Sequence, residues 1–135
     1  MSGIDPANDG TRWLQYARED LGTAVALCQE EAFVQRQVCW LAQQAAEKVL
    51  KAGLVHLQLE FPRTHDLDLL RNLLPDDWAL HDQGVDLTRL SEWAVEARYP
   101  GDWPDATVGD AQVAIRTAQS VVTSVAEHLR RETRG

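Results

Sequence analysis

Apolar residues recur at every third or fourth position over most of the chain, and this spacing constrains its fold more than any other feature. The first such stretch runs from Thr11 to about Glu30, and its apolar positions are Trp13, Ala17, Leu21, Ala24 and Cys28. The second runs from about Phe33 to Leu59 and carries Val34, Val38, Leu41, Ala42, Ala45, Val49 and Ala52. Residues at this spacing share one face of an α-helix, so each stretch predicts an amphipathic helix. Gly53 interrupts the second stretch, and we expect it to kink or loosen that helix.

Three further helices are predicted after Pro62, which ends the second stretch because proline has no amide hydrogen to donate. They run from about Asp66 to Leu74, from about Asp86 to Arg98, and from Thr107 toward the C-terminal arginines. Thr107 and Asp110 form a variant of the capping box that begins a helix.

These helices predict an all-α fold, an up-and-down four-helix bundle with one additional short helix. The sequence has no alternating strand pattern, no internal repeat and no linker. We therefore expect a single helical domain over residues 1–135, with its core at about 11–131.

Charge and composition exclude several classes of protein. The chain has 13 Lys and Arg against 21 Asp and Glu, a net charge of −8, which argues against a broad surface for nucleic acid. No apolar stretch approaches the roughly 18 residues that span a bilayer, and the first residues do not resemble a signal peptide, so we expect a cytoplasmic protein without membrane contact. Cys28 and Cys39 have no CxxC spacing and predict buried thiols in a reducing compartment.

The sequence contains none of the common catalytic motifs: no phosphate loop, nucleophile elbow, zinc-protease helix or dinucleotide-binding turn. The four histidines lack the spacing of metal ligands. The aspartates of the central turns predict helix caps and solvated turns rather than a metal cluster; they are Asp66, Asp68, Asp76, Asp77, Asp82 and Asp86. We expect neither a bound metal nor a cofactor.

The second predicted helix carries a polar face made of Gln43, Gln44, Glu47, Lys48 and Lys51. Glu47 and Lys51 have the i,i+4 spacing of a favourable ion pair, and one interpretation is an ordinary solvated face. The alternative is that the two lysines hold a phosphate while the glutamines donate to a base or a ribose.

Two short segments offer further candidate residues. Arg63 and His65 are close together, and a histidine can act as acid or base near neutral pH; the alternative is a helix cap by His65 or Asp66 with Arg63 paired to an acid. Arg98 and Tyr99 precede a loop rich in proline and glycine, where they are either a hinge or part of a site.

Three strings resemble, in order and spacing, the landmarks of one family of small helical domains. They are Gln43 to Ala52, Pro62 to Leu67, and Ala97 to Pro100. Further matches are Trp13, Ala17, Asp20, Leu21 and Ala24 near the start, and Asp110, Ala111, Ala114 and Ala118 near the end. Over roughly residues 12–130 the chain resembles the HEPN domains, named for higher eukaryotes and prokaryotes nucleotide-binding, and in particular their small stand-alone prokaryotic members.

The resemblance implies a helical bundle that forms a homodimer. Small prokaryotic members are encoded beside a minimal nucleotidyltransferase, several such pairs act as toxin and antitoxin, and other members bind nucleotides. Ribonuclease members carry an Arg, four to six residues and then a His, whereas here Arg63 is two before His65, and Trp103, Pro104 and Asp105 occupy the matching positions after Arg98. The resemblance therefore favours a binding protein over an enzyme.

Three functions follow from these observations. The leading one is a HEPN-type module that binds a nucleotide or RNA ligand, a nucleotidyltransferase partner, or both, through Gln44, Lys48, Lys51, Arg63, His65, Arg98 and Tyr99. The first alternative is a metal-independent ribonuclease toxin in which His65 acts with Arg63 or Arg98. The second alternative is a purely structural dimerisation module.

Overall fold

The computed structural model describes residues 9–30, 34–78, 80 and 86–134, and this part of the chain is helical without a strand. Its helices are α1 (Gly10–Cys28), α2 (Gln35–His56), α3 (Leu67–Leu73), α4 (Leu87–Glu96) and α5 (Val108–Arg134). The predicted all-α bundle with one additional short helix is confirmed, and the observed helix ends lie within three residues of the predicted ones.

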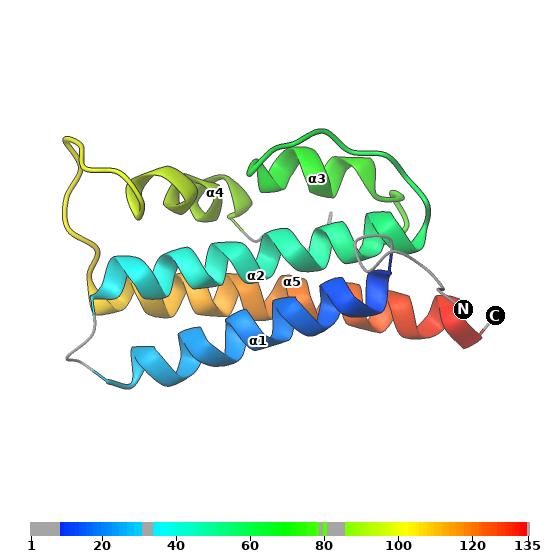
Figure 1. Cartoon of the computed structure of the whole chain (residues 1–135), viewed down its shortest axis with the longest axis horizontal. Helices are drawn as coiled ribbons and strands as arrows, with labels where there is room; N and C mark the ends of the chain where they lie inside the picture. Colours follow the sequence, from blue (N-terminus) through cyan, green and yellow to red (C-terminus); the bar gives the residue numbers. More distant parts are fainter. Residues whose placement is uncertain (1–8, 31–33, 79, 81–85, 135) are drawn as a thin grey trace, which may run out of the picture.

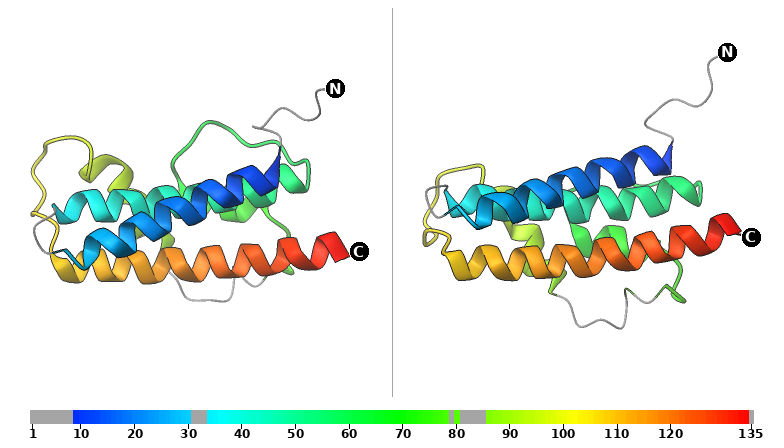
Figure 2. Two further views of the ribbon diagram at one scale, coloured as in Figure 1. Left: turned by 60° about the horizontal axis from the view of Figure 1, so that its bottom comes forward. Right: turned by 90° about the horizontal axis from the view of Figure 1, so that it is seen from below.

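The three long helices, α1, α2 and α5, lie side by side, while α3 and α4 follow one another along α2 on the side away from α1 (Figures 1 and 2). Within the described residues α2 therefore packs against every other helix. Ala42, Ala45, Ala46 and Ala52 of α2 are all fully buried, and their small side chains let the neighbouring backbones approach closely.

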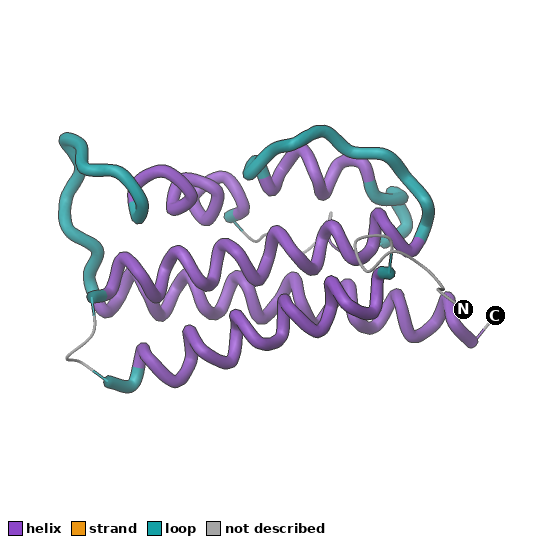
Figure 3. Tube along the Cα trace, in the orientation of Figure 1, coloured by secondary structure: helices purple, strands orange, loops and turns teal. Residues whose placement is uncertain are grey.

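Side-chain caps begin every described helix except α2. The Asp9, Asp66 and Asp86 side chains accept hydrogen bonds from the first-turn amides of α1, α3 and α4. At the start of α5, the Thr107 hydroxyl accepts from the Asp110 amide and the Asp110 carboxylate accepts from the Thr107 amide, which confirms the predicted capping box. The loops before α3 and α5 are drawn in teal in Figure 3. Asp82, which the sequence places in a turn, lies outside the described residues.

Gly53 does not interrupt α2, so the expectation of a kink or a loosened helix is wrong. The helix continues through Gly53 to His56. A Cβ atom at Gly53 would lie 3.1 Å from Cζ3 of Trp78 and 3.2 Å from Cδ2 of Leu74, both of which are buried side chains. The glycine makes room for the Trp78 ring, which also stacks on His128 of α5 at a centroid distance of 4.6 Å.

Both cysteines are free thiols, but only Cys39 is fully buried; Cys28 is partly exposed. Burial raises the pKa of the Cys39 thiol to about 12, so this side chain stays protonated and packs as a small apolar group. None of the described helices combines the length and the apolar character that crossing a membrane requires.

Candidate functional site

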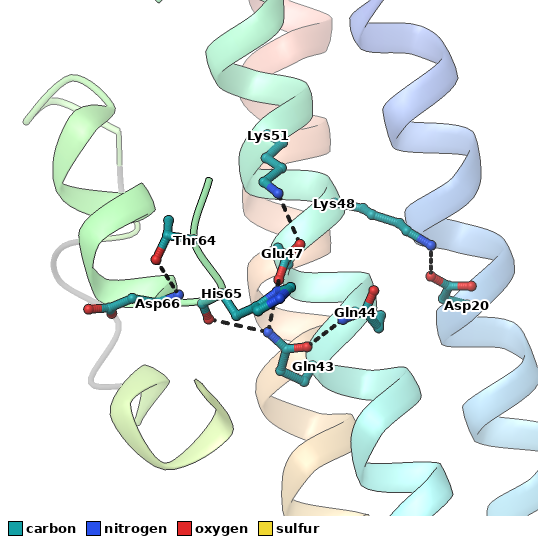
Figure 4. Close-up of polar contacts among 9 residues, drawn as sticks. All are labelled: Asp20, Gln43, Gln44, Glu47, Lys48, Lys51, Thr64, His65 and Asp66. Carbon is teal, nitrogen blue, oxygen red and sulfur yellow. Dashed lines mark hydrogen bonds and ion pairs between the residues drawn. The ribbon is translucent and has the colours of Figure 1, made fainter. Parts of the chain in front are cut away.

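Polar side chains of α2 and of the segment before α3 converge on a buried carboxylate, that of Glu47, at the middle of α2 (Figure 4). Glu47 accepts hydrogen bonds from Lys51 Nζ at 3.0 Å and from Gln43 Nε2 at 3.2 Å, and the His65 Nδ1 atom lies 2.7 Å from its Oε1. The interpretation of a solvated polar face is therefore wrong for Gln43 and Glu47, which are 0% and 5% exposed. The predicted ion pair between Glu47 and Lys51 is confirmed.

The contacts of Glu47 determine its protonation. Burial alone would raise the pKa of the Glu47 carboxyl, but the hydrogen bonds from His65, Lys51 and Gln43 outweigh burial and hold this pKa below its ordinary value. Glu47 is consequently an anion at neutral pH, and it fixes the ring of His65 in the segment between α2 and α3.

Gln43 attaches the same segment to α2 through its main chain. Its Nε2 atom donates to the carbonyl oxygen of His65 at 3.3 Å, and its Oε1 accepts from Gln44 Nε2 at 2.8 Å. The next residue, Asp66, caps α3, so the position of His65 is set from both sides. The His65 side chain nevertheless remains 55% exposed.

The two lysines of α2 already have carboxylate partners. Lys48 pairs with Asp20 of α1 at 2.6 Å, and Lys51 pairs with Glu47. Lys51 also lies near the rings of Trp13 and Phe61, with its Nζ atom 5.9 and 5.7 Å from their centroids. These ammonium groups link helices and segments to one another, and they do not form an open pair of cations for a phosphate.

A groove of about 650 Å³ lies at the other end of α2, between its first turns, the end of α4 and the segment 97–105. Its lining contains two arginines, Arg36 and Arg98, and three aromatic side chains, Trp40, Tyr99 and Trp103. Arg98 lies over the Tyr99 ring at 5.5 Å. Neither arginine has an ion pair with another residue that the structure describes.

The walls of the groove hold its aromatic rings in place. A Cβ atom at Gly101 would lie 2.5 Å from the Trp103 ring, so the indole packs directly on the glycine backbone. The indole Nε1 of Trp40 is buried without a hydrogen-bond partner among the described residues. Of the acidic residues in the lining, Glu96 is paired with Arg89 and Asp105 is exposed.

Comparisons with known proteins identify the family and agree with the fold. The sequence matches the HEPN domain family over residues 11–129. The chain belongs to the HEPN family. The crystal structure of TT1696 from Thermus thermophilus is similar at a TM-score of 0.73 and 26% identity, over 89% of this chain and 98% of that one. The crystal structure of ST0689, an archaeal HEPN homologue, is similar at 0.68 and 25%, over 89% and 97% of the two chains. No curated protein matches.

The structure divides the predicted site residues of this HEPN domain between two places. Gln44, Lys51 and His65 belong to the polar network around Glu47, and Arg98 and Tyr99 line the groove. Lys48 lies outside both, paired with Asp20 of α1. Arg63 is exposed near His65 and has no hydrogen bond or ion pair to another described residue. Arg98 and His65 therefore do not meet in one site.

The sequence prediction named only Arg98 and Tyr99 of the HEPN groove; the lining residues that it missed include Arg36, Gln37, Trp40 and Trp103. Arg36 and Trp40 have the i,i+4 spacing that puts two side chains on the same face of a helix, which is a signal the sequence contains. Trp103 lies in a loop, and no spacing rule relates a loop residue to a helix.

Proposed function

We propose that this HEPN domain is a nucleotide-binding module whose ligand occupies the groove between α2, α4 and the segment 97–105. The observation that carries the proposal is the combination of Arg36 and Arg98 with three aromatic side chains around one groove of about 650 Å³. Grooves of a few hundred to about 1,000 Å³ are the usual size of small-ligand sites.

The two kinds of side chain match the two ends of a nucleotide. Guanidinium groups bind phosphate oxygens through paired, charge-assisted hydrogen bonds. Aromatic faces stack on nucleobases, and such stacking contributes about 1–3 kcal/mol per base. Arg36 also lies in the first turn of α2, which has no side-chain cap and no acidic residue, so the positive end of the helix dipole favours an anion there.

Titration with ATP, ADP and AMP, followed by tryptophan fluorescence and by melting temperature, tests the proposal. We expect saturable quenching, because Trp40 and Trp103 line the groove, together with a higher melting temperature. Arg36→Ala and Arg98→Ala should each weaken binding about 10- to 100-fold, since a hydrogen bond to a charged group contributes about 1.5–3 kcal/mol.

The matched control is Arg63→Ala, which removes an exposed arginine that does not line the groove. It should bind as the wild type does, within a factor of about two. No quenching and no thermal shift at millimolar nucleotide would overturn the proposal, and so would equal losses in all three variants.

The same proposal includes a homodimer and a minimal nucleotidyltransferase partner in a cytoplasmic toxin and antitoxin pair, as the family resemblance implies. Exposed apolar side chains support a contact with another protein: Val95 near the end of α4, and Val108 and Val113 at the start of α5. Light scattering of the purified chain and co-purification with a co-expressed nucleotidyltransferase test these two partners. Val113→Asp should weaken the protein contact that these exposed valines make. Thr123→Asp, at an exposed position further along α5, should leave that contact unchanged.

A further inference from the structure

The contact between Glu47 and His65 has no role in the groove. Arg36 of the groove and Glu47 are eleven residues apart on α2, about 16 Å along the helix axis. A buried carboxylate has a desolvation cost, which its hydrogen bonds must offset. This pair buries Glu47 but leaves the His65 ring half exposed. Its role is therefore more than holding two segments of the chain together.

His65 differs from the other described histidines in what its ring nitrogens contact. Its Nδ1 lies on a buried carboxylate, and its Nε2 has no hydrogen-bond partner among the described residues. His128 is stacked on Trp78. His56 is exposed at the end of α2 and has no hydrogen bond or ion pair to a described residue, which makes it a natural reference for His65.

The contact with Glu47 fixes the tautomer of the neutral His65 ring. An ionised carboxylate is only an acceptor, so the proton must be on Nδ1 and the lone pair on Nε2. Gln43 Nε2 donates to the His65 carbonyl oxygen, and Lys51 Nζ donates to Oε2 of Glu47, so the ring and the carboxylate are both fixed. An oriented histidine with a free Nε2 is the arrangement of an activated nucleophile.

We propose that His65 is a phosphoryl-acceptor site, modified at Nε2 by a donor of the acyl phosphate or phosphoramidate class. The Nε2 lone pair attacks phosphorus, the Nε2–P bond forms, and the bond between phosphorus and the leaving group breaks. The Nδ1 proton stays in place, so the ring becomes a cation, which the adjacent Glu47 carboxylate stabilises.

Incubation of the folded protein with potassium phosphoramidate tests this site without any partner enzyme. Here the P–N bond breaks and ammonia leaves. Mass spectrometry of the intact chain and of its peptides should show one phosphoryl group on His65, added at least about tenfold faster than on His56, because the hydrogen bond to the Glu47 carboxylate strengthens as the ring becomes a cation. Phosphorus NMR should identify the Nε2 isomer.

Three variants isolate the role of Glu47. His65→Gln should abolish the fast labelling and His56→Gln should leave it unchanged. Glu47→Gln should slow the labelling of His65 to the rate of His56. Nitrogen-15 NMR of the unmodified wild type supplies a second measurement that does not depend on a variant's folding, and it should show neutral His65 with its proton on Nδ1.

Equal labelling of His56 and His65, the Nδ1 phosphoryl isomer, an unchanged rate in a folded Glu47→Gln variant, or a proton on Nε2 would each overturn the proposal. Arg98→Ala, which removes a groove residue, should label as the wild type does. Nucleotide binding and phosphorylation can therefore fail independently.

Discussion

Glu47 links two parts of the chain through one side chain: its own helix, through Gln43 and Lys51, and the segment that contains His65. Its partners differ in sequence distance, since Lys51 is four positions away and His65 is eighteen. Because the carboxylate is almost completely buried, its hydrogen bonds are protected from competition with water.

Glu47→Gln should lower the free energy of unfolding at pH 7 by about 1–3 kcal/mol, because buried hydrogen-bond donors lose an anionic acceptor. The folded-state pKa of Glu47 is lowered, so its contribution is present above the ordinary carboxyl pKa and is lost as pH falls through the lower folded-state value. The difference between wild type and variant should accordingly shrink as the pH falls below the ordinary carboxyl pKa of 4.5. Urea unfolding at a series of pH values measures it.

Glu60→Gln is the matched control, because Glu60 is exposed in the segment after α2. It should change stability by less than about 0.5 kcal/mol. A Glu47→Gln penalty that stays constant from pH 7 to pH 3 would contradict the assignment of an ionised, hydrogen-bonded carboxylate.

Single residues of the site were only partly predictable from the sequence. The pairing of Glu47 with Lys51 follows from helical spacing alone. The pairing of Lys48 with Asp20, 28 positions away, depends on which face of α2 is covered by α1, and local spacing does not specify that. For the same reason the sequence suggested a free pair of lysines, and the structure places each lysine on its own carboxylate.

The elements themselves were predictable because their signals are local: apolar spacing within each helix, Pro62 after α2, and Asp66, Asp86 and Thr107 at the starts of α3, α4 and α5. Gly53 shows the limit of local reasoning. By intrinsic helix propensity any glycine destabilises a helix, whereas here the missing side chain allows Trp78 to pack on α2.

Gly53→Ala and Gly22→Ala should change stability in opposite directions. A methyl group at Gly53 meets Trp78 and Leu74, both buried, so overpacking of about 1–3 kcal/mol outweighs the gain of up to about 1 kcal/mol in helix propensity. A methyl group at Gly22 of α1 meets nothing within 4 Å, so only the gain remains.

Thermal and urea unfolding of the two variants measures these effects. The melting temperature should fall for Gly53→Ala and rise for Gly22→Ala. Stabilisation by both substitutions would mean that the Trp78 ring can move aside without cost.

The whole molecule is acidic, and its excess of negative charge is concentrated in one region. Residues 63–106 contain four basic and ten acidic side chains, although this region also supplies Arg98 and part of the groove. Phosphate groups can therefore be bound locally, within the groove, but not along an extended surface.

The protein should consequently bind a mononucleotide in its groove but bind a polynucleotide only weakly. We expect single- and double-stranded RNA of about 20 nucleotides to bind no more tightly than about 10⁻⁴ M at physiological salt, the weak end of non-specific binding. Fluorescence anisotropy with labelled RNA at several salt concentrations measures this. Micromolar binding that weakens steeply with salt would contradict it.

The position of α2, in contact with all the other described helices, affects how the chain emerges during synthesis. The ribosome releases α1 and α2 first, and these two neighbours in sequence can associate at once. Helix α5 covers another side of α2, and it is the last of the described helices to be released. A chain that stops before Val108 therefore exposes an alanine- and valine-rich helix face to solvent, and premature termination there yields an aggregation-prone fragment rather than a smaller functional protein.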